Sequence, residues 1–215
     1  WGTQFGKLIV AYKMWGNKET VEKGGVDELV ALYVKFHAEA EKDDSLNDEA
    51  RAAFAKLESM DEEYLAIWQK FKEISLREYM KTYELLGVKF DSFNGESFYN
   101  DKMQRVIDEL RAKGLLIVDD GASIVDLSEY KMPPAIILKK DGATLYATRD
   151  IAAAIWRKEN YNFHKCLYVT SAGQSLHFAQ YFKVVELMGY AWAGDLVHIP
   201  YGTMSVGGEK LASRT

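Results

Sequence analysis

The stretch LYATRDIAAAIWR, residues 145–157, places Tyr146 four positions before Asp150. The apolar residues 145–147 predict a strand, and the alanine-rich run after Asp150 predicts a helix. Asp150 can then be the helix N-cap, whose side chain accepts the free N–H groups of the first turn. It can also line a ligand site together with Tyr146, because ligands of α/β sheets bind where strands pass into helices. A tyrosine and a carboxylate there suit a polar, cationic ligand.

A second strand-to-helix junction follows in SAGQSLHFAQ, residues 171–180. Its small residues let a ligand approach the backbone, and a helix N-terminus offers N–H groups to an anion such as a phosphate. Gln174 and His177 fall on the first turn, with Gln180 one turn further. His177 can equally be a half-buried histidine with an internal partner.

Glu96 lies in the turn NGES, directly after a segment, residues 88–92, that we expect to be a short strand. A carboxylate in such a turn is usually solvated. Glu96 therefore matters for a ligand site only if it converges with Asp150.

The segment GGEKLASRT, residues 207–215, is a glycine-rich loop that carries Lys210, Ser213 and Arg214. Backbone amides of such loops can hold phosphates, and cations neutralise them; the alternative is a surface hinge. The loop is not a P-loop, and no GxGxxG follows the first strand. HExxH, GxSxG and CxxC are absent, so metalloprotease, serine hydrolase and thiol redox functions have no support.

The elements that must position these residues differ between the two halves of the chain. The first half is mainly helical, with an amphipathic helix over 26–42 and a long aromatic helix that ends at Gly87. Asp141-Gly142 predicts the tip of a hairpin between AIILKK and ATLYAT. From Tyr146 the order strand, helix, strand, helix, strand predicts parallel βαβ units. We therefore expect an α/β fold: a partial doubly wound, Rossmann-like nucleotide-binding core with mainly helical insertions.

Composition narrows the functional classes. The chain has 215 residues, 48% of them apolar, and a formal net charge of −5, which argues against whole-surface attraction to nucleic acid or anionic membranes. The lone Cys166 excludes a disulfide framework and a cysteine-rich zinc site, and it favours a cytosolic setting. The sequence has no apolar run long enough to span a membrane.

Five segments, WGTQFGKLIVAY, FDSFNGESFY, LYATRDIAAAIWR, VTSAGQSLHFAQYFKVVELMGY and GEKLASRT, together resemble the class I arginyl-tRNA synthetases in their order and spacing. The resemblance covers nearly the whole chain. It implies a reaction in two steps, in which ATP and L-arginine form arginyl-adenylate and pyrophosphate, and the arginyl group then passes to the terminal adenosine of tRNA(Arg).

The resemblance also implies roles for particular residues. The residues for arginine are Glu96, Tyr146, Asp150 and Gln174. The residues for ATP are His177, Gln180, Met204 and Lys210. The catalytic residues of the class I signature loop are Lys210, Ser213 and Arg214. ATP is then a substrate, Mg²⁺ accompanies it, and we expect no metal held by the protein itself.

Departures from the family pattern lead to an expectation about the extent of the chain. The histidine motif of class I synthetases should lie upstream of WGTQFG, and the closing loop departs from the family at residues 211–213. We expect an internal piece of a catalytic core that is inactive alone. Residues 1–16, 74–97 and 143–215 would belong to the core, 17–73 to a helical insertion, and 98–142 to a second insertion with a helix and a hairpin.

Three hypotheses remain open on the sequence. The chain can be part of an arginine–tRNA ligase, a cytoplasmic monomer with L-arginine, ATP and tRNA(Arg) as partners and no membrane contact. It can be a non-catalytic amino-acid-binding module with the synthetase fold, or a structural scaffold. Convergence of Glu96, Tyr146, Asp150 and Gln174 in one pocket would exclude the scaffold.

Overall fold

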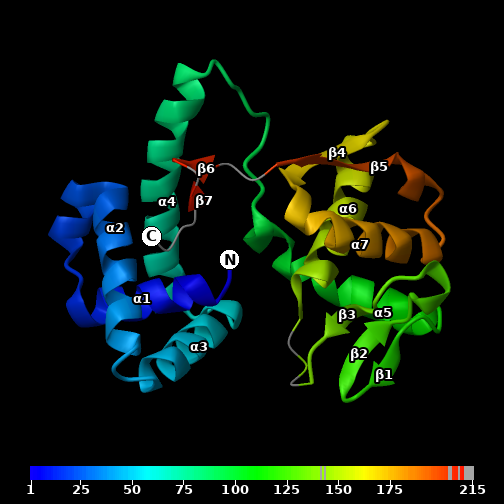
Figure 1. Cartoon of the computed structure of the whole chain (residues 1–215), viewed down its shortest axis with the longest axis horizontal. Coiled ribbons are helices and arrows are strands. Elements are labelled where there is room, and N and C mark those ends of the chain that lie inside the picture. Colours follow the sequence, from blue (N-terminus) through cyan, green and yellow to red (C-terminus); the bar gives the residue numbers. More distant parts are fainter. Residues whose placement is uncertain (141, 143, 203–204, 208, 211–215) are drawn as a thin grey trace. The chain divides into compact units, whose positions relative to one another are not determined.

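The chain divides into two compact units, the first comprising Trp1–Phe93 and the second beginning at Asn94 (Figure 1). This computed structural model describes every residue except 141, 143, 203–204, 208 and 211–215. The fold is mixed α/β and mostly helical, with small sheets in the second unit.

The first unit is helical throughout its regular structure. Its helices are α1 (Thr3–Trp15), α2 (Lys18–Ala40), α3 (Ser45–Glu58) and α4 (Glu62–Leu85). Their apolar faces meet in one core, in which Ile9, Phe36, Leu57 and Phe71 are almost fully buried. This confirms the predicted long aromatic helix, which ends before Gly87 with φ 67°, a conformation that favours glycine.

Helix α2 begins earlier than the predicted amphipathic helix. The side chain of Asn17 accepts a hydrogen bond from the backbone N–H of Glu19 at 2.7 Å, which caps a helical turn. The helix is kinked at Gly25, whose φ is 62° and ψ −134°.

The second unit carries the remaining elements. In chain order they are η1 (Glu96–Lys102), α5 (Met103–Ala112), β1 (Ile117–Asp119), β2 (Ala122–Val125), η2 (Ser128–Tyr130), β3 (Ala135–Leu138), α6 (Tyr146–Tyr161), β4 (Cys166–Ser171), η3 (Ala172–Gln174), α7 (Ser175–Leu187), η4 (Ala191–Asp195), β5 (Leu196–Tyr201), β6 (Ser205–Val206) and β7 (Glu209–Lys210). The short strand expected at residues 88–92 is absent, because that described segment has no regular structure.

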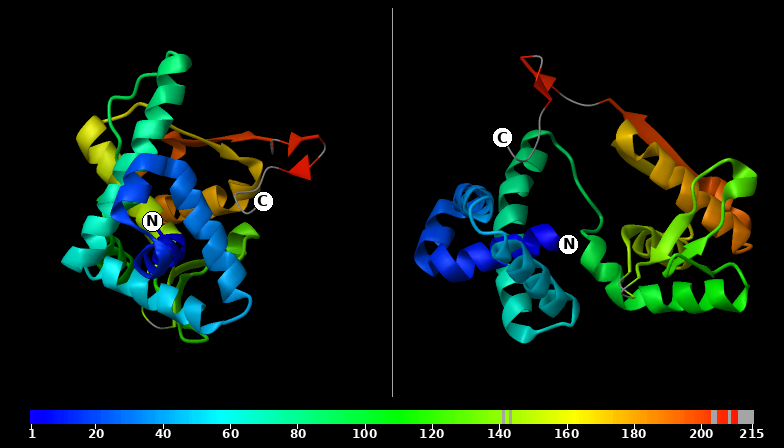
Figure 2. Two further views of the ribbon diagram at one scale, coloured as in Figure 1. Left: turned by 90° about the vertical axis from the view of Figure 1, so that its left-hand side faces the viewer. Right: turned by 60° about the horizontal axis from the view of Figure 1, so that its bottom comes forward.

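One βαβ unit of the predicted alternation is confirmed. Strands β4 and β5 pair in parallel from Cys166↔Leu196 to Ser171↔Tyr201, and α7 connects them. Helix α7 packs on one face of this pair, as both views of Figure 2 show. The other face leaves Leu167, Val169 and Ile199 exposed.

The predicted strand at 145–147 is wrong. The segment forms the first turn of α6, where Ala147 and Thr148 are buried. Strand β3 pairs instead with β2, and the predicted hairpin is reduced to a single bridge between Leu138 and Thr144. Asp141 lies outside the described residues, whereas Gly142 has φ 81° and its N–H donates to the Lys139 carbonyl at 2.9 Å, as in a turn.

Helix α6 runs through the core of the second unit. Three consecutive alanines, residues 152–154, are buried on it, and the helix contacts η1, α5, β3 and α7. Small side chains allow neighbouring elements to approach this closely on several sides. The polar residues at the start of α6 are therefore held in fixed positions by the packing of the helix.

Candidate functional site

Asp150 is not a helix N-cap. It is the fifth residue of α6, whose N-cap is Leu145 in an extended conformation without a side-chain cap bond. Tyr146 and Asp150 are separated by four residues, so both lie on one face of the helix. This leaves the carboxylate of Asp150 available for a partner from another element.

That partner is His177, on the first turn of α7. Asp150 Oδ2 and His177 Nε2 are 2.6 Å apart, and because a carboxylate oxygen accepts, the ring nitrogen is the donor. The ring of Tyr146 packs edge-on against the imidazole, with centroids 5.3 Å apart. Three residues that the sequence placed on two separate junctions thus meet in one cluster.

Glu96 is the first residue of η1 and pairs with a residue that sequence reasoning missed. Arg149 Nη1 donates to Glu96 Oε2 at 3.2 Å, and Arg149 Nε donates to Asn100 Oδ1 at 3.0 Å. Arg149 adjoins Asp150, so Glu96 is linked to the start of α6. The described residues show no hydrogen bond between Glu96 and Asp150 themselves.

Consecutive residues of α6 bind three different elements. Thr148 Oγ1 donates to the Ile137 carbonyl of β3 at 2.6 Å. Arg149 binds η1, and Asp150 binds α7. The start of the helix is therefore fixed from three directions.

The two glutamines differ in their surroundings. Gln174 is exposed at the end of η3, in the N-cap position of α7, without a side-chain cap bond. Gln180 Nε2 donates to the carbonyls of Pro133 and Pro134, at 2.9 and 3.2 Å. The amide nitrogen of Gln180 is thus used to hold the loop before β3.

The predicted loop residues are largely outside the described part. Met204, Ser213 and Arg214 lie beyond it. Lys210 pairs through its backbone with Ser205 in the small antiparallel pair of β6 and β7. The predicted roles of these four residues stay predictions.

The base of the cluster is aromatic. Tyr181 is fully buried, and its ring centroid lies 5.4 Å from that of His177. Burial raises the pKa of Tyr181 far above its usual range, with smaller contributions from Tyr168 and Asp150. Its hydroxyl therefore stays neutral beneath the Asp150–His177 pair.

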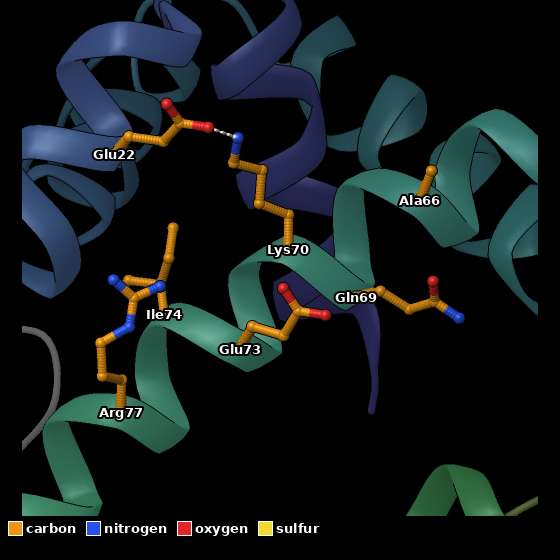
Figure 3. A pocket seen from close by; sticks show the side chains of 7 residues that line it. All are labelled: Glu22, Ala66, Gln69, Lys70, Glu73, Ile74 and Arg77. Carbon is orange, nitrogen blue, oxygen red and sulfur yellow. Dashed lines mark hydrogen bonds and ion pairs between the residues drawn. The ribbon is translucent and has the colours of Figure 1, made fainter.

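The first unit contains a separate cavity of about 500 Å³ between α2 and α4. Lys70 reaches across it to bind Glu22, while Arg77 lies beside Ile74 (Figure 3). Glu73 brings a second carboxylate, so the charges of the lining balance. The cavity holds none of the predicted site residues.

The described residues show neither a metal-ligand cluster nor a membrane-spanning helix. They contain no cluster of three or more histidine, cysteine, aspartate or glutamate side chains that could hold a metal ion. Within the same part of the chain, no helix combines the length and apolar character needed to cross a membrane.

Comparison with known proteins defines the family. Residues 1–215 match the family described as tRNA synthetases class I (R), catalytic domain. The chain belongs to this family. It is similar to the arginine–tRNA ligases of Alkaliphilus metalliredigens (59% identity) and Clostridium beijerinckii (56%), in each case over 100% of this chain and 38% of the relative. The chain thus spans little more than a third of the length of these class I synthetases.

Solved structures agree with this assignment. The arginyl-tRNA synthetase of Plasmodium falciparum superposes with a TM-score of 0.78 at 27% identity, covering 94% of this chain and 34% of that one. The Thermus thermophilus enzyme gives a TM-score of 0.76 at 18% identity, covering 98% of this chain and 42% of that one, which shows the shared fold. The expected membership of the class I synthetases is confirmed.

Proposed function

We propose that this chain is part of an arginine–tRNA ligase, which activates L-arginine with ATP to arginyl-adenylate and transfers the arginyl group to tRNA(Arg). The observation that carries the proposal is the cluster of Tyr146, Asp150 and His177, with Glu96 linked to it through Arg149. Membership of the class I synthetase family supports the same function.

The chemistry of the side chains suits a guanidinium substrate. A guanidinium is planar, permanently charged and carries five N–H donors. Carboxylates recognise it through charge-assisted, bidentate hydrogen bonds. In our proposal Asp150 and Glu96 provide these acceptors, Tyr146 borders the pocket, and Gln174 binds the head group of the amino acid. Lysine or citrulline would leave such carboxylates poorly paired, which gives strong discrimination.

The proposed ATP site adjoins this pocket. His177 and Gln180 would flank the adenylate, with Met204 and Lys210 completing the ATP contacts. Lys210, Ser213 and Arg214 would stabilise charge at the reacting phosphate, a step that depends on positioning and cations. The described residues offer no ligand cluster for Mg²⁺, so we assign no step to it; Mg²⁺ commonly binds through substrate phosphates.

We also propose that β4 and β5 belong to a larger doubly wound, Rossmann-like sheet. Parallel sheets are normally covered on both faces. The exposed face of this pair, with Leu167, Val169 and Ile199, has no such cover among the described residues. The division into core (1–16, 74–97 and 143–215) and insertions (17–73 and 98–142), the monomeric state and a cytoplasmic location are further parts of the proposal.

Arginine binding tests the function directly. Thermal unfolding of the chain is measured with L-arginine, L-lysine or L-citrulline. A ligand at about 100 times its dissociation constant stabilises by about 2.7 kcal/mol, which corresponds to a shift of roughly 5–10 °C for a chain of this size. Of the three ligands, we expect only L-arginine to raise the unfolding temperature. Asp150→Asn should abolish this shift, whereas the exposed control Asp108→Asn should keep it.

The reaction itself is tested in the native protein, with any sequence that flanks these residues. Arginine-dependent exchange of pyrophosphate into ATP, with tRNA present, is expected for the wild type. Asp150→Asn should raise the KM for L-arginine by about tenfold to a hundredfold, because a charge-assisted bond is lost. Arginine binding without exchange would favour the non-catalytic module, and absence of both would refute the proposal.

A further inference from the structure

Arg149 is a buried cation with two side-chain partners, Glu96 and Asn100. Its side chain is 8% exposed, although a buried charge is costly unless it is paired and hydrogen-bonded. Of the five N–H donors of a guanidinium, one binds Glu96 and one binds Asn100, and no other acceptor is found among the described residues. Arg149 therefore binds Glu96 through a single charge-assisted bond and not through a bidentate pair.

A second arginine–glutamate pair in the same unit gives the comparison. Arg105 and Glu159 form two parallel bonds, Nη1 to Oε2 at 3.0 Å and Nη2 to Oε1 at 2.6 Å. That pair links α5 to α6 and uses both carboxylate oxygens of Glu159. Arg149 instead engages only Oε2 of Glu96, and over a longer distance.

The geometry leaves half of the Glu96 carboxylate available. The Glu96 side chain is 54% exposed, and its Oε1 accepts no hydrogen bond from the described residues. One oxygen is therefore fixed from inside the protein, while the other remains open to a donor from outside.

We propose that Arg149 is a positioning residue for substrate specificity. It holds Glu96 through Oε2, so that Oε1 faces the guanidinium of L-arginine. Asn100 holds the Nε of Arg149 and fixes the plane of its guanidinium. This inference rests on the proposed function, since it assigns the residue that orients one of the two carboxylates of that pocket.

The position of Arg149 in the helix explains why it can do this. It is next to Asp150, which is bound in turn to His177. The packing that buries α6 therefore sets both carboxylates, Asp150 directly and Glu96 through Arg149. Neither depends on a flexible surface side chain for its orientation.

The test is a double-mutant cycle in the native protein. Arg149→Met should raise the KM for L-arginine on the order of tenfold, since Glu96 is no longer oriented by a charge-assisted bond, and leave the KM for ATP unchanged. In a Glu96→Gln background, the same Arg149→Met change should have little further effect on the KM for L-arginine. A merely structural role would produce the same loss in both backgrounds.

Two further variants keep the test decisive if Arg149→Met folds poorly. Asn100→Ala removes the bond to Nε but leaves the charge, and it should raise the KM for L-arginine in the same direction by a smaller factor. Arg105→Met is the matched control, because it also breaks a link from a neighbouring element to α6, and it should leave that KM unchanged.

The outcomes separate the inference from the proposed function. If the wild-type protein shows no arginine-dependent exchange, the proposed function fails. If it shows exchange, and both Arg149→Met and Asn100→Ala have the wild-type KM for L-arginine, only the positioning role of Arg149 is overturned.

Discussion

The hydrogen bond from Thr148 to the Ile137 carbonyl should contribute measurably to the free energy of unfolding of the second unit. The ladder between β2 and β3 is irregular at this point, since Ile136 and Leu138 have partners in β2 and Ile137 has none. Thr148 is fully buried and donates to this carbonyl at 2.6 Å. Thr148→Val keeps the shape and β-branching of the side chain but removes the donor.

The magnitude follows from these contacts. A buried acceptor left without a partner costs about 1–3 kcal/mol. The methyl group that replaces the hydroxyl regains somewhat less than about 1 kcal/mol by its burial. We therefore expect Thr148→Val to destabilise the second unit by about 1–2 kcal/mol.

Amide hydrogen exchange measures this in the second unit separately, since a chain with two compact units need not unfold in one step. A loss of about 1–2 kcal/mol should speed exchange of the most protected α6 amides roughly 5–30-fold. Thr82→Val, at an exposed position of α4, is the control and should leave these amides unchanged. Unchanged protection in Thr148→Val would refute the reasoning.

Two further predictions concern charge and exposed surface. Hydrogen bonding from Arg105 lowers the pKa of Glu159. The contribution of the Arg105–Glu159 pair to stability is therefore fully present above the unfolded pKa of about 4.3. It is lost as the pH falls through the lower pKa of the folded state. Because both side chains are about half exposed, Glu159→Gln should cost less than about 1 kcal/mol at pH 7 and still less near pH 3. Thermal unfolding that shows an equal cost at both pH values would contradict this. Val169→Lys should destabilise the native protein in thermal unfolding, because we propose that this exposed face is covered there and a buried unpaired charge is costly. If Val169→Lys leaves the native protein as stable as the wild type, the proposed larger sheet is contradicted.

The elements that sequence reasoning predicted correctly depend on local patterns. The aromatic spacing of α4, with a glycine after its end, identifies the helix, and the alternation from Cys166 onward identifies β4, α7 and β5. Strand β2 was missed because ASIV is too short to show a period. The segment at 145–147 was misassigned because Leu, Tyr and Ala suit a strand or a helix, and burial of Ala147 and Thr148 decides for the helix.

The candidate site was predictable to a similar extent. The two predicted strand-to-helix junctions indicate a ligand site at Tyr146, Asp150 and His177, and His177 contacts both of the other residues. The sequence allows Asp150 as a cap only if the helix begins after it, whereas α6 begins at Tyr146. Arg149 was missed because nothing in its local sequence distinguishes it from a surface arginine. Its partners lie about 50 residues earlier, and only the folded unit brings them together.

The three-way attachment of α6 has a consequence for ligand-induced motion. Successive residues of a helix point about 100° apart, so bonds from three neighbours in a row restrain rotation about the helix axis. A closure around a bound ligand would then involve the elements at the far ends of these bonds, such as the start of α7 or η1. A single-residue insertion before Thr148 would turn all three side chains away from their partners at once. Among related sequences, insertions and deletions at the start of α6 should therefore be rarer than substitutions.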